Sequence, residues 1–145
     1  MKVVLQRVAQ ARVDVAGELV GRIGPGLLLL AGFAPGDEPA QVRAAAQRLL
    51  AYRIFPDEQG RMNRDVRQAG GGVLAVPNFT LEADTRRGLR PSFASAAPPA
   101  QAQPLFEEFL AALRASGLDV ASGRFGADMQ VQLVNDGPVT LSFAF

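Results

Sequence analysis

Residues 135–140, with the sequence Asn-Asp-Gly-Pro-Val-Thr, constrain the fold of this chain more than any other segment. Apolar residues alternate with polar ones on both sides of it: Met129, Val131 and Leu133 before, and Val139, Leu141, Phe143 and Phe145 after. An Asp-Gly pair between two such runs is the strongest short-range indication of a β-hairpin. Pro138, however, has no N–H for the ladder and restricts Gly137 before it. We therefore expect a hairpin whose tip is shaped for more than turning the chain.

The chain contains no histidine and no cysteine, which removes several kinds of chemistry at once. Catalytic triads, thiolate nucleophiles and histidine-based zinc sites are excluded. The fourteen carboxylates form no pattern of metal ligands, and the triple glycine at 70–72 lacks the spacing of a dinucleotide-binding loop. We expect no metal and no cofactor.

Length and composition indicate one globular domain covering residues 1–145. No apolar run reaches the roughly 18 residues that a membrane-spanning helix needs, so a cytoplasmic location without membrane association is expected. The net charge is +1, and the basic residues are fourteen arginines and one lysine. These charges alone do not identify a binding partner. Arginine is well suited to phosphate recognition, but a net charge of +1 produces only a weak overall electrostatic field.

The pattern of elements predicts an α/β fold. Strands are expected in the first third, including a strand at 27–32 that is apolar on both faces, and another at 73–76. Helices are expected at 39–52 and 104–116, separated by a long arginine-bearing connection at 82–104, and three short strands finish the chain. The order predicts mixed and antiparallel sheets in a layered β/β/α arrangement, with two main helices packed on one side.

Two loops remain as candidate sites. Pro77, Asn78, Phe79 and Thr80 follow a buried strand, where backbone N–H groups can point outward and form an oxyanion hole. Judged separately, Phe79 is expected in the core and Thr80 in a turn, and no side chain nearby could act as a base for the Thr80 hydroxyl. The second candidate is the Gly137–Pro138 tip.

The chain resembles the bacterial D-aminoacyl-tRNA deacylases over essentially its full length. No single matching stretch is specific, but their order and spacing are. They include residues 6–8, 21–28, 52–55, 62–63, 68–71, 79–81, 83–85, 90–93, 123–125, 127–131 and 135–140.

The resemblance implies a homodimer with active sites at the subunit interface. The activity implied is hydrolysis of the ester between a D-amino acid and the terminal adenosine at the tRNA acceptor end, with glycine also cleared from Gly-tRNA(Ala). Gly137 and Pro138 would be joined by a cis bond, held by Arg7, and their carbonyls would occupy the space that an L side chain needs. N–H groups of Phe79 and Thr80 would position the ester, while the ribose 2′-OH helps to activate water.

Pro77 and Asn78 depart from the Ser-Gln that the family usually has before Phe-Thr. Pro77 lacks a hydroxyl and an N–H, and Asn78 is one methylene shorter than glutamine. Related deacylases that edit L-aminoacyl-tRNA differ in these same motifs, so such an activity stays open as an alternative, although Arg7 favours the D-specific one. A non-catalytic module that binds the tRNA end, and a general esterase, are further alternatives.

Overall fold

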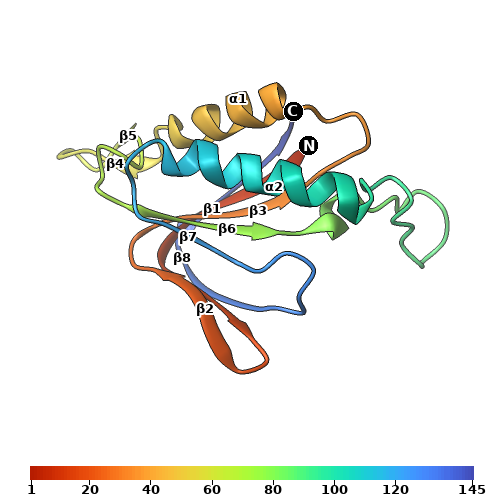
Figure 1. Cartoon of the computed structure of the whole chain (residues 1–145). Coiled ribbons are helices and arrows are strands. Elements are labelled where there is room, and N and C mark those ends of the chain that lie inside the picture. Colours follow the sequence, from red (N-terminus) through yellow and green to blue (C-terminus); the bar gives the residue numbers. More distant parts are fainter.

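The computed structural model describes all residues, 1–145, and has one large sheet with two helices on the same face (Figure 1). The strands of this sheet are β1 (Lys2–Val15), β2 (Glu18–Ile23), β3 (Gly26–Gly32), β6 (Gly72–Pro77), β7 (Val120–Ser122) and β8 (Gln130–Ala144). Strands β3, β6 and β7 are parallel to one another, whereas β1 is antiparallel to β2, β3 and β8. A small hairpin of β4 (Phe55–Pro56) and β5 (Met62–Arg64) lies apart. This confirms the predicted mixed α/β architecture.

Strand β3 is central because its sequence is apolar on both faces. Its Leu27, Leu28 and Leu29 are buried, two of them facing one core and one facing the other. Continuous burial of this kind is typical of a parallel strand that is covered on both sides. The first core lies between the sheet and the helices. The second lies where β2 and the adjoining halves of β1 and β8 bend over the opposite face, which produces the predicted β/β/α layers.

Helix α1 (Pro39–Leu50) places its apolar stripe on the sheet, as the 3.6-residue periodicity predicts. Helix α2 (Pro99–Arg114) begins five residues before the predicted start at Pro104. Pro99 is an acceptable first helical residue, and Pro104 removes one backbone hydrogen bond without ending the helix. Buried side chains on both sides of it, Ala102 and Leu105, keep the segment packed on the sheet. Neither helix is long and apolar enough to cross a membrane.

The predicted C-terminal hairpin is wrong, and so is the expectation of three short final strands. β8 is one strand, and both of its halves pair with β1 in the same antiparallel sense. At residues 135–140 the pairing jumps, because Asn135 faces Val8 whereas Thr140 faces Gln6. Four residues therefore bulge out of the ladder where a turn was expected. A hairpin and a bulged single strand show the same local alternation of apolar and polar residues. Only the pairing with the distant strand β1 distinguishes the two.

Candidate functional site

The bulge in β8 is fixed from below by Arg7, whose side chain is almost fully buried. Its Nε donates to the carbonyl of Asp136 at 2.9 Å and lies 3.3 Å from the Asp136 carboxylate. Its Nη1 donates to the carbonyl of Ile54. Arginine suits this position because its planar, permanently charged group holds several donors in fixed directions. Arg7 thus connects the bulge to the segment that precedes β4.

Asn135 and Thr140 close the bulge from the sides. The Asn135 amide accepts from the Val139 N–H at 2.8 Å and donates to the Thr140 hydroxyl oxygen at 3.0 Å. Gln6 on β1 donates to the same hydroxyl oxygen at 3.2 Å. Val139 itself is buried in the helix-side core. Gly137 and Pro138, joined by a cis peptide bond, therefore project from a base that is held on three sides.

Gly137 cannot be replaced without displacing its surroundings. Its φ is +148°, and a Cβ atom there would lie 2.8 Å from both the N and the Cγ2 of Val139. The same Cβ would lie 3.3 Å from Nη2 of Arg7. Both the close approach of Val139 and the positive φ therefore require glycine at this position.

The second candidate loop follows β6 directly and forms a short 3₁₀ helix, η1 (Phe79–Glu82). Asn78 precedes it and continues the β3–β6 ladder, since its N–H donates to the Ala31 carbonyl at 2.7 Å. Gly32 provides the space for this turn, because a Cβ there would lie 2.8 Å from the Asn78 carbonyl oxygen. The last residue of η1, the buried Glu82, pairs with Lys2 at 3.1 Å. These contacts hold η1 against the end of the sheet.

Asn78 and Thr80 interact in a way that the sequence did not reveal. The Asn78 Oδ1 accepts from the Thr80 N–H at 3.2 Å and from the Thr80 hydroxyl at 2.5 Å. One of the two N–H groups expected to point outward is therefore engaged within the loop. The Phe79 N–H donates to no side chain and to no loop carbonyl. Asparagine just before a helix is a strong N-cap residue, and this preference is the one feature of the sequence that could have indicated the hydrogen bond from the Thr80 N–H.

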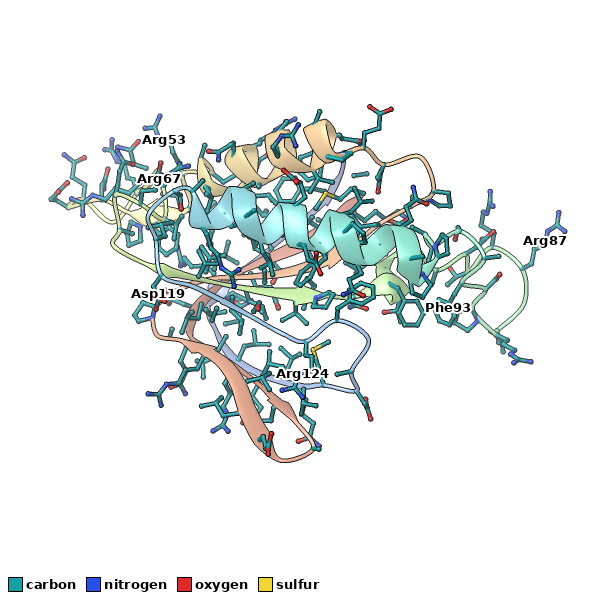
Figure 2. The ribbon with its side chains drawn as sticks, viewed as in Figure 1. Arg53, Arg67, Arg87, Phe93, Asp119 and Arg124 are labelled. Atoms are coloured by element: carbon teal, nitrogen blue, oxygen red, sulfur yellow. The ribbon has the colours of Figure 1, made fainter.

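Phe79 was expected in the core when judged separately, and this is wrong. Its side chain is 57% exposed and meets Phe93 edge-to-face, with the ring centroids 5.2 Å apart. Phe93 is also exposed and belongs to the segment between η1 and α2 (Figure 2). Two exposed aromatic rings beside a main-chain donor leave an apolar surface at the edge of the site.

The two candidate loops lie far apart within the chain. The bulge lies opposite Arg7 on β1, and Arg7 in turn pairs with Leu27 at the beginning of β3. Pro77 on β6 pairs with Ala31, near the other end of β3. Three strand spacings separate β8 from β6, or about 14 Å, and four residues along the strand add about 13 Å. Gly137 and Phe79 are therefore roughly 20 Å apart by these spacings.

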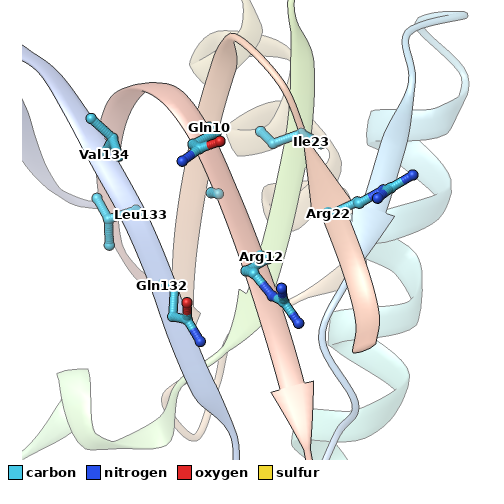
Figure 3. Close-up of a pocket in the computed structure, with 8 residues that line it drawn as sticks. Gln10, Arg12, Arg22, Ile23, Gln132, Leu133 and Val134 are labelled. Carbon is cyan, nitrogen blue, oxygen red and sulfur yellow. The ribbon is translucent and has the colours of Figure 1, made fainter. Parts of the chain in front are cut away.

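A hollow of about 400 Å³ lies elsewhere, on the faces of β1, β2 and β8 (Figure 3). Its polar lining includes Gln10, Arg12, Arg22 and Gln132, and Arg12 is paired with Asp14. None of the predicted site residues line it. No three His, Cys, Asp or Glu side chains of the chain gather in a way that suits a metal ion.

Comparison with known proteins places these loops in a family context. The D-Tyr-tRNA(Tyr) deacylase family matches residues 4–144. A D-aminoacyl-tRNA deacylase of Azotobacter vinelandii is 61% identical over 140 residues, covering 97% of each chain, and one of Alcanivorax borkumensis is 57% identical with the same coverage. The solved structure of the c-Myc DNA Unwinding Element Binding Protein superposes with a TM-score of 0.94 at 36% identity, covering 100% of this chain and 99% of that one. A probable eukaryotic D-amino acid tRNA deacylase superposes at 0.85 with 20% identity, covering 98% and 97%, and shows the shared fold.

Proposed function

Because the chain belongs to the D-Tyr-tRNA(Tyr) deacylase family and is a D-aminoacyl-tRNA deacylase, a hydrolase, we propose how its main chain performs the reaction. The substrate is a D-amino acid esterified to the terminal adenosine of tRNA. Water adds to the ester carbonyl, the carbonyl oxygen gains negative charge, and the bond to the ribose oxygen breaks as that oxygen takes a proton. The products are the free amino acid and tRNA, and the enzyme works in the cytoplasm.

The site is completed by a second copy of the chain. The observation that carries this proposal is the separation of roughly 20 Å between Gly137 and Phe79 within one chain. Such a distance is too large for both loops to touch one aminoacyl group. In a two-fold symmetric dimer, the bulge of one protomer reaches the η1 loop of its partner, and the pair forms two equal sites.

The Phe79 N–H binds the ester oxygen, because it is the donor of this loop without a partner in the chain. Preorganised main-chain donors of this kind stabilise a developing oxyanion, and losing one typically costs about 10²–10³ in rate. The carboxylate of η1, that of Glu82, is buried and paired with Lys2, so the loop offers no exposed general base beside Phe79 or Thr80. The ribose 2′-OH of the substrate helps to activate the attacking water in place of a protein base, so the reaction is assisted by the RNA.

Chirality is decided by the bulge. The main chain of Gly137 and Pro138 occupies the volume into which an L side chain would extend, and Arg7 and Asn135 hold it there. An L-aminoacyl group is rejected by a clash, whereas a D-aminoacyl group directs its side chain elsewhere. Glycine has no side chain to reject, so Gly-tRNA(Ala) is also cleaved.

The first experiment compares hydrolysis of D-Tyr-tRNA, L-Tyr-tRNA and Gly-tRNA(Ala) by the purified protein. Cleavage of the D and glycyl substrates with L-Tyr-tRNA spared is expected. Preferential cleavage of L-Tyr-tRNA would instead support the alternative, an editing enzyme for L-aminoacyl-tRNA, which the departures at Pro77 and Asn78 leave open. Substrate with a 2′-deoxy terminal ribose should react at least 10²-fold more slowly, the low end of a general-base contribution.

The role of the Phe79 N–H is tested by a matched pair of variants. Phe79→Pro removes the N–H at the first position of η1, where proline is structurally acceptable, and also removes the ring. Phe79→Ala removes the ring only. We expect Phe79→Pro to lose at least tenfold more kcat than Phe79→Ala. Equal losses would mean that the ring, and not the N–H, is what the reaction needs.

A mixing experiment tests whether the site is shared between protomers. Gly137→Ala displaces the bulge but keeps the η1 loop, so it should cleave L-Tyr-tRNA, whereas Phe79→Pro keeps the bulge but is inactive. When Gly137→Ala is refolded together with excess Phe79→Pro, each working η1 loop receives an intact bulge from its partner. Cleavage of L-Tyr-tRNA should then disappear while cleavage of D-Tyr-tRNA remains. Unchanged L cleavage would mean that each chain filters its own substrate, and no L cleavage by Gly137→Ala alone would contradict the filter itself.

A further inference from the structure

The loop formed by residues 84–93 is a long, almost continuously exposed segment of the chain. Every residue from 85 to 94 is exposed, and Leu89 has no shielding contact. Among its charged groups are Arg86, Arg87 and Arg90. Long exposed loops on a rigid scaffold are common places for binding residues.

The base of this loop is nevertheless well ordered. Asp84 and Ser92 exchange two backbone hydrogen bonds, of 2.8 and 3.0 Å, in an antiparallel bridge. The Ser95 hydroxyl donates to the Glu82 carbonyl in η1, and the Ala97 N–H donates to the Phe33 carbonyl at 2.8 Å. The loop thus presents its arginines from a fixed base, so less conformational entropy is lost when a ligand binds.

Two of the three arginines are not neutralised. Arg86 forms a bidentate pair with Asp84, with hydrogen bonds of 2.9 and 2.7 Å, which hold the pKa of Asp84 well below its ordinary value. Arg87 and Arg90 have no hydrogen bond or ion pair to any side chain. Figure 2 shows Arg87 extending into solvent at the end of the molecule where Phe93 lies. An open hollow of about 490 Å³ lies between four polar or charged residues, Asp84, Arg86, Arg87 and Ser92.

The opposite end of the molecule also carries arginines, and only some of them are paired with carboxylates. Arg53 and Arg67 lie there, near the β4–β5 hairpin (Figure 2). Arg67 interacts with Asp65 and with the Gln47 side chain, and Arg64 in β5 is paired with Glu58. Arg53, however, donates only to the Asn63 carbonyl, so unpaired arginines occur at both ends, and what distinguishes Arg87 is its place at the end of the molecule where Phe93 lies.

The position of the loop relative to the ester site defines its ligand. Phe93, at its end, touches Phe79, and the chain from Asp84 to Leu89 can extend about 16 Å from the base. A stacked nucleic-acid strand carries one phosphate per 3.4 Å, so this reach corresponds to about five nucleotides. The three nucleotides immediately before the terminal adenosine, which complete the single-stranded 3′ end of tRNA, lie within this reach.

We propose that Arg87 and Arg90 bind the phosphodiester backbone of the single-stranded 3′ end of tRNA and thereby deliver the aminoacyl group to the η1 loop. This rests on the proposed function, because the ester site defines which phosphates lie within reach. The contacts are to the backbone, so they are independent of base sequence and of the amino acid. They strengthen substrate binding and leave the chemical step unchanged.

The test is binding of an uncharged, fluorescein-labelled minihelix of the acceptor stem, which requires no deacylation. The variant Arg87→Gln/Arg90→Gln is compared with Arg48→Gln/Arg114→Gln, which removes the same charge from exposed positions near the ends of α1 and α2. The loop variant should bind at least tenfold more weakly than the control variant. Its plot of log affinity against log salt should be less steep by about 1.4, because each lost single-strand phosphate contact removes about 0.7.

Two further arms separate the possible sources of the effect. A blunt minihelix without the 3′ tail should bind both variants equally, and a deficit of the same size there would overturn the assignment to the single-stranded end. In deacylation, the loop variant should raise KM for D-Tyr-tRNA at least tenfold with kcat unchanged, while D-tyrosyl-adenosine, which has no phosphate, should react normally. Equal minihelix binding by both double variants would overturn the proposal even if deacylation is confirmed. If binding differs but no deacylation occurs, the proposed function fails and the RNA surface stands.

Discussion

Asn78→Asp separates the structural role of this loop from its electrostatic role. Aspartate caps a helix as well as asparagine does, so the two hydrogen bonds that Thr80 donates to Oδ1 are kept. The melting temperature should therefore stay within about 2 °C of the wild-type value. What changes is the charge, because a carboxylate now lies beside the N–H group that binds the ester oxygen in the proposed mechanism.

The size of the effect follows from the distance. From ordinary hydrogen-bond lengths, an oxyanion bound by the Phe79 N–H would lie about 5 Å from an oxygen bound by the Thr80 N–H. Two unit charges at that distance repel by about 3.3 kcal/mol at an effective dielectric constant of 20, and by half as much at 40. The expected fall in kcat on D-Tyr-tRNA is therefore between about 20-fold and 300-fold. Repulsion of the RNA phosphates would raise KM instead, so the two parameters separate the two effects.

Single-turnover deacylation of D-Tyr-tRNA at several pH values is the assay. The deficit should shrink as the pH falls towards about 4, where the introduced carboxylate is protonated. Asn78→Ala is the control for the lost cap, and it should lower stability by about 1 kcal/mol without a pH-dependent deficit. A wild-type kcat for Asn78→Asp at neutral pH would refute an oxyanion at this loop.

Three further outcomes test the rest of the site. Gly137→Ala should lower the melting temperature by several degrees, since the added Cβ clashes with the main chain two residues on at a cost of about 1–3 kcal/mol; Gly17→Ala, also at positive φ but in open space, separates this clash from backbone strain. Arg7→Met should cost about 2–4 kcal/mol in urea unfolding and permit cleavage of L-Tyr-tRNA, and Arg7→Lys should not restore selectivity because an ammonium group cannot reproduce the same fork of donors. Thr80→Ala should retain most of kcat; its complete loss would indicate a threonine nucleophile.

The layers of the fold could be predicted because their determinants are local. The apolar run in β3 and the stripe of α1 each reveal which faces are covered, without reference to any distant residue. The start of α2 could not be placed, because Pro104 is equally compatible with the first turn and with an early interior position that packing tolerates. Local rules identify such elements more securely than they identify their ends.

The two loops of the site show where sequence reasoning stops. Residues 135–140 satisfy the rules for a hairpin, and only pairing with β1, more than a hundred positions away, turns them into a bulge. Phe79 has the composition of a core residue, yet η1 directs it outward to meet Phe93. The bulge depends on a non-local strand pairing, and the direction of the Phe79 ring depends on a turn of four residues. The intrinsic structural propensities of the residues determine neither.

The resemblance described for the sequence predicts Ser-Gln where this chain has Pro77 and Asn78, and the positions of these two residues show how the proposed main-chain site can absorb the difference. Pro77 is the last residue of β6, in register with Ala31, and the Asn78 N–H continues the ladder to the Ala31 carbonyl. The side chain of Asn78 is turned back onto Thr80, so it shapes the loop from within. The donor that the proposed mechanism requires, the Phe79 N–H, comes directly after both departures. Substitution at 77 and 78 therefore changes how the loop is held while the group that meets the ester in the proposed mechanism is preserved, which a side-chain nucleophile at either position would not have allowed.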